Sequence, residues 1–97
     1  MIDVTPLKID DKVALGLKVE LPDSPPILIL IGQTGFVMCG FLNMDAAEKL
    51  NVTAAMVSGV KNFDDVFRAE IKAATSKAQI KGIRIGMKGE EAVKLLL

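Results

Sequence analysis

The stretch "KVALGLKVEL", residues 12–21, alternates large apolar side chains with small or charged ones over ten residues. The odd positions carry Val13, Leu15, Leu17, Val19 and Leu21, and the even positions carry Lys12, Ala14, Gly16, Lys18 and Glu20. Side chains two residues apart lie on the same face of a strand, so this pattern predicts a β-strand with one buried face. The strand therefore leaves one apolar face that something must cover.

The segment before this strand predicts a hairpin partner. Residues 2–9, "IDVTPLKI", also alternate, although more weakly, and Asp10 and Asp11 are typical of a tight turn between two strands. Pro6 interrupts the alternation. Because proline cannot donate a hydrogen bond to a neighbouring strand, residues 2–9 are expected to form an edge strand.

The segments after this strand predict the centre of the sheet. A turn cluster, "PDSPP" at 22–26, leads into "ILILI" at 27–31, and the loop "GQTG" leads into "FVMCGF" at 36–41. Both strand segments are apolar at consecutive positions. That pattern is typical of central strands that are covered on both faces.

The rest of the chain alternates short helices and strands. We expect helices over 44–50, 63–69, 76–81 and 89–97, and strands over 54–60, 69–74 and 83–87. Residues that can cap a helix start precede the first three helices: Asn43 or Asp45, Asn62, and Thr75 or Ser76. Gly82 can end the third helix in the left-handed conformation. The sequence thus predicts one mixed α/β (α+β) domain over residues 1–97, in which a β-rich N-terminal half forms a mixed sheet and the chain ends in a helix.

Composition predicts self-association. The chain has 97 residues, of which 51% are hydrophobic, and 12 basic residues balance 12 acidic ones. A small domain cannot bury so much apolar surface alone, and covering it with another copy of the chain is the usual solution. Zero net charge gives no general attraction to nucleic acid or to anionic lipid. We therefore expect a homo-oligomer, with no nucleic-acid partner and no membrane partner.

The expected location is the cytoplasm. The longest apolar stretch, counting glycines, is "GFVMCGFL" at 35–42, which is far too short to span a membrane. The N-terminal residues show no basic segment followed by an apolar one. A single cysteine cannot form an intrachain disulfide.

Several chemistries are excluded because the chain has no histidine and one cysteine. No Ser-His or Cys-His pair, imidazole base or imidazole metal ligand can form. Neither a zinc knuckle nor a redox cysteine pair is available, and no dinucleotide-binding or P-loop motif occurs. The paired acids stand at turns and helix starts, where capping and the helix dipole explain them. We expect no metal and no cofactor, and we assign no catalytic residue.

Cys39 allows two interpretations. A reactive thiol needs a cationic or helix-N-terminal environment, whereas the neighbours Met38, Gly40 and Phe41 predict an apolar one. A free cysteine packs readily as a small hydrophobic residue, which favours a core role. However, ligand sites in α/β sheets favour the C-terminal ends of strands, and Cys39 stands near such an end. Ser58 and Gly59 in "VSGV" stand at the next one and are weaker candidates for the same site.

The segment "GMKGEE" is a further weak candidate for a ligand site. Gly86, Lys88 and Gly89 lie between an expected strand and an expected helix, where free backbone N–H groups and a lysine can bind an anion. Glu90 and Glu91 already place negative charge at the same helix start, which favours a simple turn.

The C-terminal half carries an excess of positive charge. Residues 68–88 contain six basic side chains and one acidic one, and residues 1–48 contain three basic and seven acidic ones. A basic face of this kind is most often solvated, but it can also bind an anionic metabolite or an acidic face of a neighbouring subunit. No aromatic residue lies within 68–88 to stack on bases, which argues against nucleic acid.

Three stretches in order resemble the YunC-like family, a domain of unknown function found in bacteria and archaea. They are "GFVMCGFLNMDAAEKL", "AAMVSGVKNFDDVF" and "ATSKAQIKGIRIGMKGEEAVKLL". The most specific pieces are residues 38–40, 57–60 and the segment 82–89. The resemblance runs from about Thr5 to the C-terminus and implies an α/β domain whose N-terminal β-region, about residues 2–42, mediates tetramer formation. It implies no activity, substrate or catalytic residue.

Two functional hypotheses follow. The first is a cytoplasmic homo-oligomer, as a tetramer on grounds of the resemblance, that acts by association or by binding a small ligand without catalysis. The second is an enzyme or sensor of a small anionic metabolite, with a site near Cys39 and the loop Gly86–Gly89.

Overall fold

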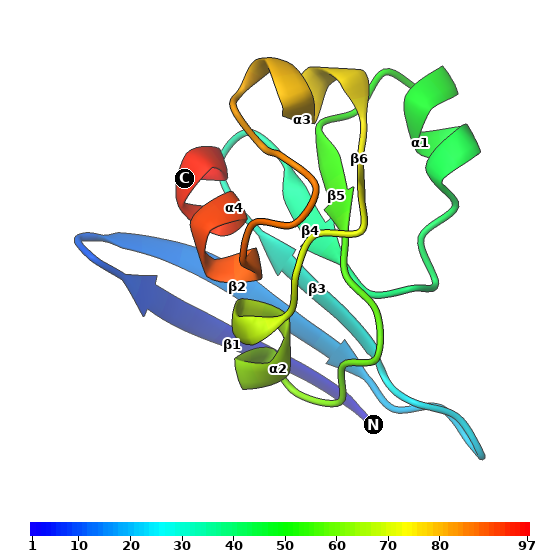
Figure 1. Cartoon of the computed structure of the whole chain (residues 1–97). Coiled ribbons are helices and arrows are strands. Elements are labelled where there is room, and N and C mark those ends of the chain that lie inside the picture. Colours follow the sequence, from blue (N-terminus) through cyan, green and yellow to red (C-terminus); the bar gives the residue numbers. More distant parts are fainter.

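The computed structural model describes residues 1–97 and confirms the expected mixed α+β fold (Figure 1). The elements in chain order are β1 (Ile2–Ile9), β2 (Lys12–Val19), β3 (Ile27–Ile31), β4 (Phe36–Met38), α1 (Met44–Lys49), β5 (Ala54–Met56), α2 (Phe63–Arg68), β6 (Ala73–Ala74), α3 (Ser76–Ile80) and α4 (Gly89–Leu96). The strands form one six-stranded sheet in the order β1-β2-β3-β4-β5-β6. No helix is both long and apolar enough to cross a membrane.

The sheet is mixed because one of its strand pairs is parallel. β1 to β4 run antiparallel to one another in chain order, β5 runs parallel to β4, and β6 is antiparallel to β5. The connection from β4 to β5 contains α1, so the chain returns to the same end of the sheet before β5 begins. β4 and β5 therefore end side by side, which is where ligand sites form in α/β sheets.

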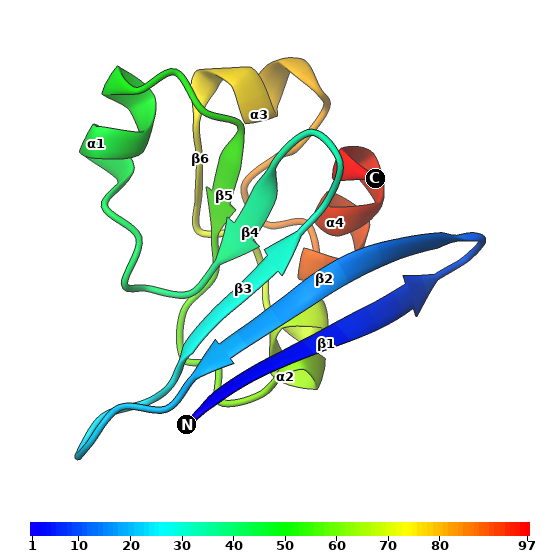
Figure 2. The same cartoon turned by 180° about the vertical axis from the view of Figure 1, so that it is seen from behind.

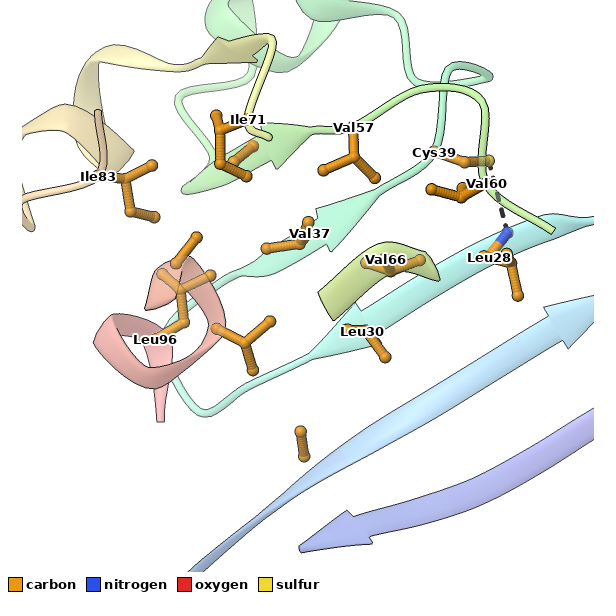
Figure 3. Packing of buried hydrophobic residues seen from close by; sticks show 14 of the residues in the cluster. Leu28, Leu30, Val37, Cys39, Val57, Val60, Val66, Ile71, Ile83 and Leu96 are labelled. Atoms are coloured by element: carbon orange, nitrogen blue, oxygen red, sulfur yellow. Dashed lines mark hydrogen bonds between the residues drawn. The ribbon is translucent and has the colours of Figure 1, made fainter. Parts of the chain in front are cut away.

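Helices cover one face of the sheet, and the core lies beneath them. α2 and α4 contact each other, α4 packs on β3 and β4, and α2 packs on β3 (Figure 1). Leu28, Leu30 and Val37 point toward these helices and are fully buried, together with Val66 of α2 and Leu96 of α4 (Figure 3). The apolar strands β3 and β4 thus hold the core together from the centre of the sheet.

The opposite face of β1 to β4 is uncovered, as the view from behind shows (Figure 2). The strand register places eleven apolar side chains on this open face: Ile2, Val4, Val13, Leu15, Leu17, Val19, Ile27, Ile29, Ile31, Phe36 and Met38. Their exposure is high toward the edge, at 66% for Ile2 and 55% for Val13. Residues 27–31 are therefore covered on one face only within a single chain, contrary to the expectation from their pattern.

The small residues of β2 explain why its even positions face the helices. Ala14 is fully buried, and a Cβ on Gly16 would lie 2.8 Å from the ring of Phe63 in α2 and 2.9 Å from Leu7. Only a residue without a side chain allows the ring to approach the strand so closely. The large odd-numbered side chains of β2 consequently occupy the open face.

β1 forms one edge of the sheet, as Pro6 predicts. The N–H of Glu20 donates to the carbonyl of Met1 at 3.0 Å, and hydrogen-bonded pairs alternate along an antiparallel ladder. Pro6 faces Leu15 and, by this alternation, occupies a pair without hydrogen bonds. Its nitrogen therefore lies on the outer edge, where the missing N–H breaks no bond within the sheet.

Most of the expected helix boundaries are confirmed. The side chains of Asn43, Asn62 and Thr75 each accept a hydrogen bond from the backbone three residues ahead. They are thus the capping residues, rather than Asp45 or Ser76. Gly82 follows α3 with φ of 103°, in the left-handed region that favours glycine.

The strands of the second half are shorter than expected, and residues 83–87 form no strand. Gly86 has φ of 95°, and the N–H of Met87 donates to the carbonyl of Arg84, so the segment turns instead of extending. Residues 36–41 and 54–60 leave the sheet after Met38 and Met56, and only Ala73–Ala74 of the segment 69–74 pairs with β5. The N–H of Ile71 bonds instead to the carbonyl of Met87.

Candidate functional site

A cleft of about 300 Å³ opens where β4 and β5 end side by side. Its lining comes from the loops that follow the two strands and from the turn before β3: Pro25, Pro26, Cys39, Gly40, Phe41, Gly59, Val60 and Lys61. We call this the Cys39 cleft. It brings together two of the candidates from the sequence, Cys39 and Gly59, and it places them on the helix-covered side of the sheet.

Cys39 forms the floor of the cleft and is 4% exposed. Its backbone N–H donates to the carbonyl of Leu28 at 3.0 Å, and its Sγ accepts the N–H of Leu28 at 3.4 Å (Figure 3). The thiol also points at the carbonyl oxygen of Pro26, 3.9 Å away. The sulfur thus replaces the carbonyl that would normally accept from Leu28 in the ladder. With Val57 and Val60 in the same core cluster, Cys39 has the surroundings of a structural residue.

Ser58 and Gly59 lie on the loop after β5. Gly59 has φ of 71°, which lets the chain turn sharply and form one wall of the cleft. Ser58 is exposed and is not part of the cleft lining. Because the chain has no histidine, Ser58 cannot form a Ser–His pair.

Two lysines beside the cleft were missed by the sequence reasoning. A second hollow of about 300 Å³ shares Pro26 and Lys61 with the cleft, and its other lining residues are Lys18, Glu20, Leu21 and Ser24. Lys18 faces Leu28 across the β2–β3 pair, and Leu28 bonds to Cys39 in the next position of the sheet. Lys18 and Cys39 therefore stand in one row, two strands apart. The sequence did contain a signal for Lys18, because its even position places it on the same face of β2 as Ala14 and Gly16.

The loop Gly86–Gly89 lies elsewhere and contributes nothing to the lining of the cleft. The N–H of Gly86 donates to the carbonyl of Ile71 at 2.9 Å, and the N–H of Gly89 donates to the carbonyl of Ala69 at 2.8 Å. These amides are therefore not available to an anion. A Cβ on Gly89 would collide with the carbonyl oxygen of Val66, so glycine is required for the packing of α4 on α2.

The basic side chains of residues 68–88 do not gather into one site. Arg84 donates to the carbonyls of Gln79 and Ile83, and Arg68 lies 3.9 Å from Asp65. Lys88 lines a hollow on α2 and α4 together with Arg68 and the two glutamates of the first turn of α4. Lys77 and Lys81 line another, next to Thr34 and Thr53. These charges serve separate parts of the surface.

No cluster of histidine, cysteine, aspartate or glutamate that could hold a metal ion is present. The pKa of one acidic group is clearly perturbed: Glu48 of α1 has a pKa below its ordinary value of 4.5. The cause is the backbone N–H of Ser76, which donates to its carboxylate at 2.9 Å. This bond joins α1 to the start of α3 and lies outside the cleft.

The fold and the cleft define a small mixed-sheet domain with one covered and one open face. A family model for a domain of unknown function, DUF1805, matches residues 38–96. The chain belongs to this DUF1805, YunC-like family. It is 27% identical to the uncharacterized protein YunC of Bacillus subtilis (strain 168), over 96% of this chain and 95% of that protein. The crystal structure of a protein of unknown function, TA1206 from Thermoplasma acidophilum, is similar with a TM-score of 0.94 and 33% identity, and the match covers all of this chain and 94% of that one.

Proposed function

We propose that this uncharacterised domain works as a homo-oligomer that associates through the open face of its sheet. The observation that carries the proposal is the row of uncovered apolar side chains on β1 to β3, where Val4 is 58% exposed and Leu15 is 41% exposed. Contiguous apolar surface of this kind is rarely left in contact with water in a monomer. A tetramer is the assembly that the family resemblance implies.

The chemistry of the open face favours a second copy of the same chain as its occupant. Lys8, near the end of β1, is the one charged residue among the positions that the register assigns to this face. A face with a single charge near the end of one strand has little to repel an identical face, and a two-fold axis brings one patch onto itself. The two longest strands, β1 and β2, have eight residues each and are about 27 Å long at ~3.4 Å per residue, which gives a face of a size usual for the core of a dimer interface.

We further propose that the assembly resides in the cytoplasm and carries out no catalysis of its own. A lone buried thiol without a disulfide partner suits a reducing compartment. The absence of histidine removes the commonest general base.

The test is the mass of the assembly in solution. We expect light scattering after gel filtration to give a multiple of the 10.4 kDa chain mass at micromolar concentration, four times that mass for a tetramer. Leu17, between Val4 and Ile29 on the open face, is the position to change. Leu17→Glu should give a smaller species, because a charge buried in an apolar interface loses water without gaining a partner.

A matched control separates this effect from a general loss of solubility or folding. Ile80→Glu makes the same kind of change on α3, away from the sheet, where the side chain is 83% exposed, and should leave the mass unchanged. Leu15→Glu serves if Leu17→Glu fails to fold, since Leu15 is already partly exposed within one chain. A wild-type protein that is monomeric at micromolar concentration refutes the proposal.

A further inference from the structure

We propose that the Cys39 cleft and the lysine-lined hollow beside it together bind one small amphipathic anion. In this proposal the apolar body of the ligand lies over Cys39, and its carboxylate or phosphate group lies between Lys61 and Lys18. The two cavities adjoin each other, because Pro26 and Lys61 line both of them.

The apolar part of the site accepts a compact group. Pro25, Pro26, Phe41 and Val60 supply apolar walls, and Gly40 and Gly59 leave the space above the thiol unfilled. A cavity of about 150 Å³ holds one benzene molecule, so a volume of about 300 Å³ accommodates roughly a dozen non-hydrogen atoms. That volume is at the lower end of the range for small-molecule sites. A ring with a short side chain fits this space.

The lysines give the site its preference for an anion. Neither the Lys18 ammonium nor the Lys61 ammonium lies within 4.0 Å of a carboxylate, whereas three ion pairs elsewhere in the protein meet that limit. The Asp65 carboxylate accepts the backbone N–H of Lys61 at 3.0 Å, but its ion pair is with Arg68. Glu20 also lines the hollow, but its carboxylate lies 4.0 Å from the N-terminal ammonium of Met1. Asp3 faces Lys18 across the β1–β2 pair without forming an ion pair. The hollow therefore holds two cations whose charges are not paired.

The spacing of the two parts matches one ligand. Lys18 and Cys39 stand in one row of the sheet with a single strand between them, which separates their backbones by roughly 10 Å at ~4.8 Å per strand. An aryl or branched alkyl acid of about a dozen atoms spans this distance once the lysine side chain reaches inward. Both residues lie on the helix side, so association through the open face leaves the site accessible.

The site is built for binding and not for chemistry at the sulfur. The N–H of Leu28 and the carbonyl of Pro26 already engage the thiol, and the chain has no histidine to remove its proton. The inference does not depend on self-association, because a monomer would hold the same residues in the same places.

The experiment is a titration of the full chain followed by two-dimensional NMR of its backbone amides. The probes are phenylacetate, phenyl phosphate and the neutral 2-phenylethanol. We expect both anions to give saturable shifts at Gly40, Gly59 and Lys61. We expect the Kd of 2-phenylethanol to be about fivefold higher than that of phenylacetate, since one partly exposed charge pair is worth about 1 kcal/mol.

Lysine variants test whether Lys61 and Lys18 bind the anionic group of the probe. Lys61→Met keeps an unbranched side chain of nearly the same length and removes its charge, so it should weaken phenylacetate binding several-fold and leave 2-phenylethanol binding unchanged. Lys18→Met should act in the same direction, and it replaces Lys61→Met if that variant does not fold. Lys72→Met, at a lysine outside both cavities, is the matched control and should change neither probe.

Three results overturn the proposal. The first is the absence of saturable shifts from both anions at about 10 mM, where a Kd of 1 mM would already give nearly complete occupancy. The second is equal affinity for 2-phenylethanol and phenylacetate, which removes the role of the lysines. The third is an equal effect of Lys72→Met and Lys61→Met, which indicates general electrostatic attraction in place of a site.

Discussion

Replacing Gly89 with alanine should destabilise the protein, although alanine is the better helix former. Gly89 is the first residue of α4, and in an ordinary helix the exchange gains about 1 kcal/mol. Here the added methyl group would collide with the carbonyl oxygen of Val66 and lie 3.0 Å from its carbonyl carbon. Both atoms belong to the backbone of α2 and cannot rotate away. The start of α4 must therefore move off α2.

This movement has two costs that can be added. It stretches the 2.8 Å hydrogen bond from the N–H of Gly89 to the carbonyl of Ala69, worth about 1 kcal/mol. It also strains the contact between α2 and α4 above the core, where inserting a methyl group typically costs about 1–3 kcal/mol. After the gain in helix propensity, the free energy of unfolding should fall by roughly 1–3 kcal/mol.

Urea denaturation followed by far-UV circular dichroism, at one fixed protein concentration, measures this loss. Gly40→Ala is the matched control, because Gly40 has an ordinary backbone conformation and the nearest atom to its added Cβ is that of Ser58, 4.0 Å away. It should change the free energy of unfolding by no more than about 0.5 kcal/mol. If Gly89→Ala is as stable as Gly40→Ala, the reasoning about the contact between α2 and α4 is wrong.

Two further predictions concern single hydrogen bonds. Cys39→Ala should lower the free energy of unfolding by about 1–3 kcal/mol, because the N–H of buried Leu28 loses its acceptor. Cys39→Ser should lower it less. The reverse order of the two variants in urea titrations would contradict the role given to the sulfur. The pKa of Glu48 is lowered by the N–H of Ser76, so the stability it contributes is present above 4.5, its ordinary pKa, and is lost as the pH falls through the lower pKa of the folded state. Glu48→Gln should therefore reduce the loss of thermal stability between neutral and acidic pH, and an unchanged pH dependence would exclude this link between α1 and α3.

Much of the fold could be predicted from local patterns. Alternation identified β1 and β2, consecutive apolar residues identified β3 as central, and capping side chains marked the starts of α1, α2 and α3. These features depend on residues that are near one another in the chain. Local physics is sufficient for them, because a cap or a strand face is defined within a few residues.

Features set by contacts between distant residues could not be predicted. The alternation of Ile83, Ile85 and Met87 imitates a strand, but Gly86 adopts a positive φ and the segment bonds to Ile71 instead. The sequence alone does not tell which face of β2 lies against the helices, because the contact between Gly16 and Phe63 decides it.

The candidate site shows the same division. The sequence places Cys39 and Gly59 after two expected strands, and in the structure they line the same cleft because the parallel strands β4 and β5 end together. Lys18 lies about twenty residues earlier in the chain, and only the β2–β3 register brings it into the same row of the sheet as Cys39. The separation of the Gly86–Gly89 loop from the cleft is also a consequence of packing, because its amides pair with residues 69–71.

The position of Pro6 on the outer edge of β1 limits how further chains can add to the sheet. An edge strand of eight residues with a full set of donors and acceptors could add further chains one after another into an endless ribbon. A missing donor in the middle of that edge interrupts such a ladder at each junction. In the proposed homo-oligomer, copies meet instead through faces related by rotation, and such assemblies close on themselves after a small number of subunits. The imide nitrogen of Pro6 therefore disfavours a fibre that would grow by adding strands at β1.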